Sequence, residues 1–168
     1  DTWSREESDL HGDREAPEVN RKLREAYFAA ITMVDKNIGK VLDYLKERGE
    51  LDDTLIIFTS DHGEMLGDKG YYSKSLPYDP SVRIPFIVRY PKKFEGGKVC
   101  DDFVDLFDIL PTCLDACGLS YPSDRQLPGE SLFAKAPLGD REHQIVVYGD
   151  GARRWIMSRD TRYKYVYW

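Results

Sequence analysis

The fold expected of this chain follows from one stretch, TLIIFTSDHGEMLGDKGYYSKS, residues 54–75. Residues 55–58 form a continuous apolar run of strand-forming side chains. A strand that is apolar on both faces belongs in the interior of a parallel sheet covered by helices. Asp61, His62 and Gly63 follow this run directly, at the strand's carboxyl end, where open α/β sheets hold their sites. The stretch therefore predicts an α/β fold with polar residues at a sheet edge.

Helix and strand patterns alternate on both sides of this stretch. Apolar residues spaced by three and four predict one long amphipathic helix that begins near Pro17 and ends near Gly49. The segment IPFIVRYP, residues 84–91, predicts a second buried strand. The segment VDLFDILPTCLDACG, residues 104–118, predicts a helix of about twelve residues with Asp108 as its N-cap. The alternation supports the α/β class.

The sequence pattern changes toward the end of the chain, from alternating helices and strands to short strands and turns. Three short strand-forming segments, residues 144–149, 153–158 and 163–168, are separated by turn residues, which predicts an antiparallel meander. We therefore divide the chain into an α/β part, residues 1–138, and the beginning of a small antiparallel subdomain, residues 139–168. The first fifteen residues are polar and aperiodic and are expected to form a loop or a tail.

Composition excludes some kinds of partner. The net charge is -6 and the pI is about 5.1, which argues against nucleic acid or a polybasic membrane contact. No apolar run approaches the ~20 residues that span a bilayer. Cys100, Cys113 and Cys117 form no metal-ligand pattern, and Cys113 and Cys117 are expected to be buried free thiols. Localisation stays open.

The residues after the first strand can be interpreted in two ways. A carboxylate beside an imidazole, Asp61 and His62, can bind a divalent cation: Asp suits Ca²⁺ or Mg²⁺, and His extends the range to Mn²⁺ or Zn²⁺. Lys74, twelve residues after His62, would bring a positive charge to an anion. The alternative is that Asp61 caps a turn, His62 is an ordinary loop histidine and Lys74 is a solvated surface lysine. Spacing alone leaves both open.

Several segments resemble, in the same order, the second half of the sulfatase family, within the alkaline-phosphatase-like superfamily. They are the opening stretch, DPSVRIPFIVRYP, VDLFDILPTCLDACGL, LPGESL and RDTRYKYVYW. The resemblance implies part of an alkaline-phosphatase-like α/β sheet flanked by helices. It also implies that Asp61 and His62 belong to a metal site, with Ca²⁺ expected first and Mg²⁺ or Mn²⁺ as alternatives. Lys74 would be the catalytic lysine that contacts the sulfate of a small-molecule or saccharide sulfate ester.

The chain departs from the family pattern in one decisive respect. The family's nucleophile is a formylglycine made from Cys or Ser in a C/S-x-P-x-R motif, and this sequence contains no such motif. We expect the motif upstream of Asp1, in a missing part of the same catalytic domain, so this chain is interpreted as a fragment that is inactive alone. Lys69 stands where many relatives have His, which blurs the subfamily.

Two alternatives to a sulfatase remain. A one-metal phosphonate monoester or phosphodiester hydrolase of the same superfamily would share Asp61, His62 and Lys74. A two-metal phosphodiesterase is disfavoured because only His143 follows His62 in the sequence. The chain could also be a non-catalytic binding module, in which case the whole protein would lack the nucleophile motif.

Overall fold

The computed structural model describes residues 17–121, 126–133, 141–151 and 154–168, which form two compact units. The first unit comprises residues 1–54 and 62–85, and the second comprises residues 55–61 and 86–168. The tail predicted for the first fifteen residues lies outside the described residues. So does the predicted domain boundary between residues 138 and 139.

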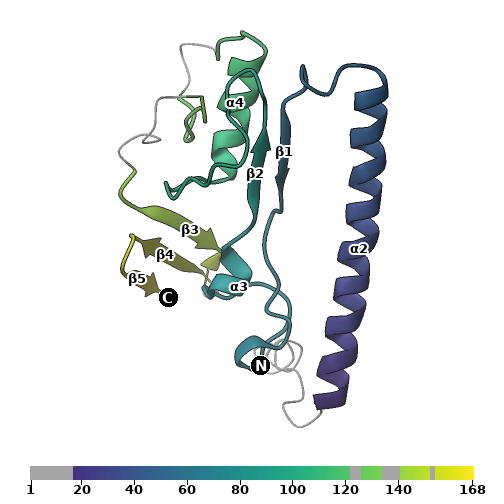
Figure 1. Ribbon diagram of the computed structural model, residues 1–168. Coiled ribbons are helices and arrows are strands. Elements are labelled where there is room, and N and C mark those ends of the chain that lie inside the picture. The colour runs from purple at the N-terminus through teal and green to yellow at the C-terminus, as the bar shows by residue number, and fades with distance from the viewer. Residues whose placement is uncertain (1–16, 122–125, 134–140, 152–153) are drawn as a thin grey trace. The chain divides into compact units, whose positions relative to one another are not determined.

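The first unit contains the long helix that the sequence predicts. Helix α2, Pro17–Glu47, has 31 residues, with proline in the first turn and Gly49 beyond its end at a φ of 69° (Figure 1). A left-handed residue just after the last turn is a common helix stop. The unit also holds a short 3₁₀ helix, η1, Asp68–Gly70, and a one-turn helix, α3, Asp79–Val82. No helix in the described part of the chain is long and apolar enough to cross a membrane.

The second unit contains the two strands predicted around the opening stretch, but their direction differs from the prediction. Strand β1, Ile56–Thr59, pairs antiparallel with β2, Phe86–Arg89. The expectation that the 55–58 strand lies in a buried parallel sheet is therefore wrong for this pair. The chain between the strands returns β2 in the opposite direction. Phe58 and Ile87 are partners in the register and remain 40% and 60% exposed, so one face of the pair is not covered.

The predicted helix at 104–118 is shorter and is capped differently. It consists of a 3₁₀ turn, η2, Leu106–Asp108, followed by α4, Ile109–Ala116. Asp108 occupies the N-cap position of α4, as predicted, but its side chain makes no capping hydrogen bond to α4. The side-chain cap belongs to Asp105, at the start of η2, which accepts a hydrogen bond from the Phe107 amide at 2.8 Å. Asp108 completes a capping box by accepting from the Asp105 amide at 2.9 Å.

The cysteine prediction is half correct. All three are free, but Cys100 and Cys117 are exposed and Cys113 is only half-buried. The expectation that Cys113 and Cys117 are buried is wrong: Cys117 is the residue that follows α4 and belongs to its last turn, and the described residues leave it uncovered.

The C-terminal meander is confirmed. Strands β3, Gln144–Tyr148, β4, Trp155–Arg159, and β5, Lys164–Tyr167, pair antiparallel in the order β3-β4-β5. Trp155 and Met157 on the central strand are each 2% exposed. The ring of Tyr148 stacks on that of Trp155, with 5.5 Å between the ring centroids. The turn after β4 is held by the Asp160 carboxylate, which accepts hydrogen bonds from the amides of Tyr163 and Arg162. These bonds hold the pKa of Asp160 below its ordinary value.

Candidate functional site

Asp61 lies at the carboxyl end of β1, as the sequence predicted. Its side chain is exposed, and the Ser60 hydroxyl lies 3.5 Å from its Oδ1 atom. The boundary between the two units falls between Asp61 and His62. Asp61 therefore belongs to the unit that contains β1, and His62 belongs to the unit that contains the following loop.

His62 and Lys74 are brought together within the first unit. The Nδ1 atom of His62 lies 2.7 Å from the carbonyl oxygen of Gly63. A carbonyl can only accept, so Nδ1 carries the proton and Nε2 keeps its lone pair. The Nζ atom of Lys74 lies 2.5 Å from Nε2 and, as an ammonium, can only donate. The side chains thus meet at the one histidine nitrogen that is able to bind a cation or to accept a hydrogen bond.

The segment between these two residues is a compact hairpin. The amide of Met65 donates to the carbonyl of Ser73, and the amide of Gly67 donates to that of Tyr71, both at 2.8 Å. Helix η1 forms the tip of the hairpin, and the Met65 side chain is fully buried. Lys74 is the residue that immediately follows the hairpin, so the fold of the hairpin decides where Lys74 lies.

Two helices of the first unit hold this hairpin in place. The Gly63 amide donates to the Ser81 carbonyl in α3 at 2.8 Å. From α2, Arg24 donates through Nε to the Leu66 carbonyl and through Nη2 to Asp68 Oδ1, both at 3.0 Å. The loop is therefore tied at its start and near its tip.

Sequence reasoning missed one polar residue in this loop, Glu64. Its Oε1 atom accepts hydrogen bonds from the amides of Leu66 and Ser73, on opposite sides of the hairpin. No spacing rule predicts the contact with Ser73, because that partner is a backbone amide nine residues away. The one available signal was a carboxylate beside the predicted site in a loop rich in glycine.

The donor atoms suit a divalent cation but do not complete its coordination. In the part of the chain that the structure describes, no three His, Cys, Asp or Glu side chains gather closely enough to hold a metal ion. The Asp61 carboxylate and the His62 Nε2 atom are donors of the right chemical type. Ca²⁺ takes six to eight oxygen ligands, so further ligands would have to come from elsewhere.

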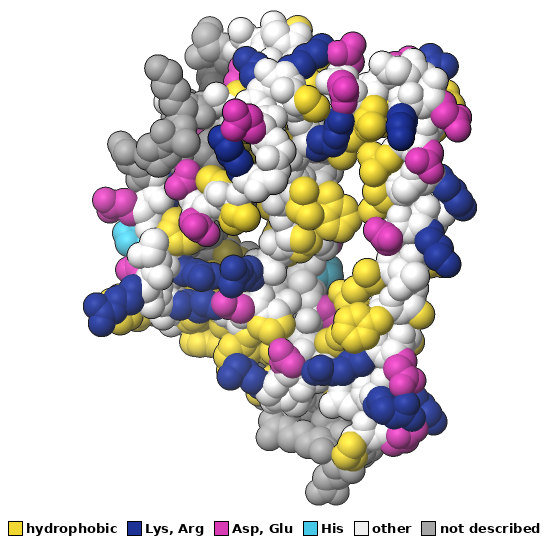
Figure 2. All heavy atoms as spheres, viewed as in Figure 1, with side chains coloured by type: hydrophobic (Ala, Val, Ile, Leu, Met, Phe, Trp, Pro, Cys, Tyr) yellow, Lys and Arg dark blue, Asp and Glu magenta, His cyan; other side chains and the backbone are white. Residues whose placement is uncertain are grey.

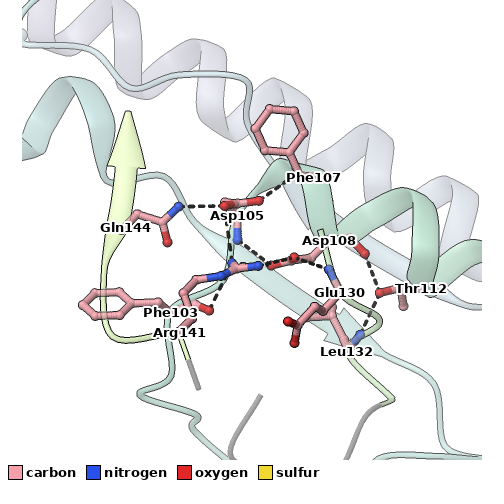
Figure 3. Close-up of polar contacts among 9 residues, drawn as sticks. All are labelled: Phe103, Asp105, Phe107, Asp108, Thr112, Glu130, Leu132, Arg141 and Gln144. Carbon is pink, nitrogen blue, oxygen red and sulfur yellow. Dashed lines mark hydrogen bonds and ion pairs between the residues drawn. The ribbon is translucent and has the colours of Figure 1, made fainter. Parts of the chain in front are cut away.

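A second polar cluster lies in the second unit, around Arg141 (Figure 3). The guanidinium binds both carboxylate oxygens of Asp108, at 2.9 Å and 2.8 Å, and Asp108 is 2% exposed. The Glu130 amide donates to Asp108 Oδ1, and Gln144 Nε2 donates to Asp105 Oδ2. Burial opposes the ionisation of Asp108, but these hydrogen bonds outweigh it, with Arg141 first, so the pKa of Asp108 is lowered. The cluster ties η2 to β3 and is structural.

Comparisons with known proteins agree with one another. Residues 4–119 match the family described as Sulfatase. An arylsulfatase from Clostridium perfringens is 41% identical over 153 residues, which are 85% of this chain and 31% of that protein.

Two solved structures share the fold. One was solved in complex with its substrate D-glucosamine-2-N,6-O-disulfate and matches with a TM-score of 0.81 and 31% identity. The match covers 98% of this chain and 35% of the chain of that structure. The other, a phosphonate monoester hydrolase from Silicibacter pomeroyi, has a TM-score of 0.80 and 31% identity and covers 92% of this chain and 35% of its own. The likeness confirms the predicted fold class. The chain spans about a third of the length of these relatives.

Proposed function

This chain belongs to the sulfatase family, and on that premise we propose that it supplies part of the active site of a sulfuric ester hydrolase. In this proposal Asp61 and His62 are metal-site residues, and Lys74 is the catalytic lysine that contacts the sulfate group. The observation that carries the proposal is the 2.5 Å approach of Lys74 Nζ to His62 Nε2. This approach puts a nitrogen that is able to bind a cation beside an ammonium that is able to bind an anion.

The proposed chemistry depends on where positive charge is held. A bound Ca²⁺, held by the Asp61 carboxylate and His62 Nε2 with ligands from elsewhere in the protein, would supply Lewis-acid stabilisation of the sulfate oxygens. Mg²⁺ or Mn²⁺ would supply the same chemistry. Lys74 adds a compact point charge and three hydrogen-bond donors, which stabilise oxygens that gain negative charge during the reaction. The lone pair of Nε2 serves one partner at a time, so the Lys74 ammonium donates either to His62 or to an anionic ligand.

The nucleophile is proposed to lie in a longer protein of which this chain is a fragment. The sequence has no C/S-x-P-x-R motif, and it spans about a third of the relatives' length. We therefore place a formylglycine upstream, in the remainder of the same catalytic domain. The substrate class we favour is a saccharide sulfate ester. This preference is supported by the structural relative that was solved with a sulfated glucosamine.

The test of Lys74 uses the full-length protein and a matched lysine. Lys74→Ala is expected to lower kcat/KM for an aryl sulfate by about 100-fold or more, because a charge that stabilises the transition state is lost. Lys98→Ala is the control, because Lys98 is 72% exposed and, among the described contacts, forms an ion pair with Glu95 alone. Equal activity of the two variants would contradict the role of Lys74.

The second candidate is a phosphonate monoester hydrolase, and the similarity in fold to such an enzyme favours considering it. The same full-length protein should be assayed with aryl sulfates and with phosphonate monoesters. A higher kcat/KM for sulfate esters supports the sulfatase proposal, and a higher value for phosphonates overturns it. Lack of turnover of either class would favour a non-catalytic module.

A further inference from the structure

We propose that Glu64 positions Lys74 for its role, by holding the backbone of the hairpin that directly precedes Lys74. This inference rests on the proposed function, since that function gives Lys74 its task. It goes further in assigning a part to a residue that neither the sequence motif nor the metal site requires.

The contacts of Glu64 carry the first step. Its Oε1 atom accepts from the Ser73 amide at 2.5 Å and from the Leu66 amide at 3.1 Å. One carboxylate oxygen therefore joins the two sides of the hairpin just before Lys74. A carboxylate that accepts from backbone amides forms bonds roughly twice as strong as neutral ones. The half-buried position of Glu64 limits competition from water.

The backbone around Lys74 explains why such a bond is needed. Ser73 and Ser75, on either side of Lys74, have φ values of 65° and 86°. Positive φ is unfavourable for residues other than glycine and persists only where the surroundings enforce it. Glu64 holds the amide of Ser73, the first of the two. Relaxation of Ser73 to negative φ would turn the next residue in a new direction.

The side chain of Lys74 would then no longer point toward His62. Its Nζ atom now lies 2.5 Å from His62 Nε2, at the end of a flexible four-carbon stem. Glu64 itself bonds to loop amides and to neither His62 nor Lys74 among the described contacts. It is a positioning residue and does not touch the reacting groups.

The experiment compares Glu64→Ala and Glu64→Gln in the full-length protein, with Glu95→Ala as the control on an exposed glutamate. Glu64→Ala is expected to lower kcat/KM for an aryl sulfate by roughly 10- to 100-fold, the cost of a misplaced catalytic group. Glu64→Gln is expected to stay within about threefold, because its amide oxygen still accepts both hydrogen bonds. Failure of glutamine to restore activity would overturn the inference.

A double variant separates positioning from general damage. If Glu64 acts through Lys74, then Glu64→Ala is expected to have little further effect in a Lys74→Ala background. Additive losses would mean a role unrelated to Lys74 and would overturn the inference. If Lys74→Ala alone leaves activity unchanged, it is the proposed function that fails.

Hydrogen exchange gives a readout that does not depend on activity. The amides of Leu66 and Ser73 are expected to exchange faster in Glu64→Ala than in the wild type, while Glu64→Gln keeps most of their protection. Unchanged exchange at both amides in Glu64→Ala would show that the carboxylate does not hold the hairpin.

Discussion

A methyl group added at Gly63 would lie 1.9 Å from the carbonyl oxygen of Pro80 and 2.9 Å from its carbonyl carbon. Backbone atoms cannot swing aside as the end of a side chain can. The Gly63 amide also donates a hydrogen bond to the Ser81 carbonyl, so the close approach of the two backbones is part of the fold. We expect Gly63→Ala to lower the free energy of unfolding by about 2 kcal/mol, as overpacking does. Urea denaturation would measure it.

Gly39 provides the matched control for this substitution. It lies inside α2, and a Cβ there would meet nothing within 4 Å among the described atoms. Gly39→Ala should therefore raise the free energy of unfolding by roughly 0.5 to 1 kcal/mol through helix propensity. A loss of stability similar to that of Gly63→Ala would contradict the assignment.

Asp108 gives a residue-scale prediction that depends on pH. Its pKa is lower in the folded chain than the ordinary value of 3.8, so it binds protons more readily when unfolded. The stability that it contributes is fully present above that ordinary value and is lost as the pH falls through the lowered pKa. Asp108→Asn removes the charge that binds Arg141 at two oxygens and leaves only the longer ion pair with Asp105, at 3.3 Å, among the described contacts. It is expected to cost about 3 kcal/mol at pH 7.

Urea unfolding between pH 2 and pH 7 would check this prediction. The difference between the wild type and Asp108→Asn should shrink on the acid side of pH 4, whereas Asp115→Asn, an exposed position on α4, should cost little at any pH. A difference for Asp108→Asn that does not change with pH would argue against the ion pair.

Sequence reasoning singled out the candidate residues that a local motif marks and missed one whose contacts depend on folding. Asp61 and His62 stand out because a glycine and the end of an apolar strand adjoin them. Glu64 does not stand out in the sequence, because the Ser73 amide that donates to its carboxylate comes near only when the hairpin forms. Glycines are similar in this respect, because nothing in the sequence separates the crowded Gly63 from the open Gly39.

Among the elements, those with a strong local period were predicted best. Helix α2 follows from its spacing of three and four, and the meander follows from its short strands and turn residues. The direction of β1 against β2 could not be predicted in this way, because the pairing joins residues about thirty positions apart. Nor could local spacing predict that the Asp108 carboxylate is bound by Arg141, which lies 33 residues later in the chain.

Contact between two elements can be tested at Arg24, which joins α2 to the hairpin. Its side chain is 44% exposed, so Arg24→Ala is expected to cost at most about 1 kcal/mol of global stability. Loss of its bonds to Leu66 and Asp68 should nonetheless speed hydrogen exchange near the hairpin tip.

Arg21 is the matched control for Arg24. It pairs only with Glu18 and Glu25 of its own helix among the described contacts. Arg21→Ala should therefore leave exchange in the hairpin unchanged. Equal effects of the two variants on the hairpin would show that Arg24 does not support it.

At the scale of the whole molecule, helix α2 carries an apolar stripe that its own unit does not bury. None of its residues is buried, and large apolar side chains are exposed along it (Figure 2). Leu23, Ile31 and Val34 are 45%, 49% and 49% exposed and belong to the stripe that predicted the helix. Such a stripe normally faces a core. The relatives, about three times longer, have the additional chain from which a covering could come.

The number of candidate ligands leads to a prediction about metal binding. Asp61 and His62 offer two donors, and no group of three candidate ligands occurs within the described ranges. Ca²⁺ held by so few protein ligands keeps most of its water and dissociates readily. Calorimetric titration of the 168-residue chain with Ca²⁺ is therefore expected to show no tight binding. The full-length protein should bind Ca²⁺, and should bind it more weakly after Asp61→Asn or His62→Ala. Tight binding by the chain alone would mean that it contains a complete site, contrary to the proposal that the remaining ligands lie elsewhere in the protein.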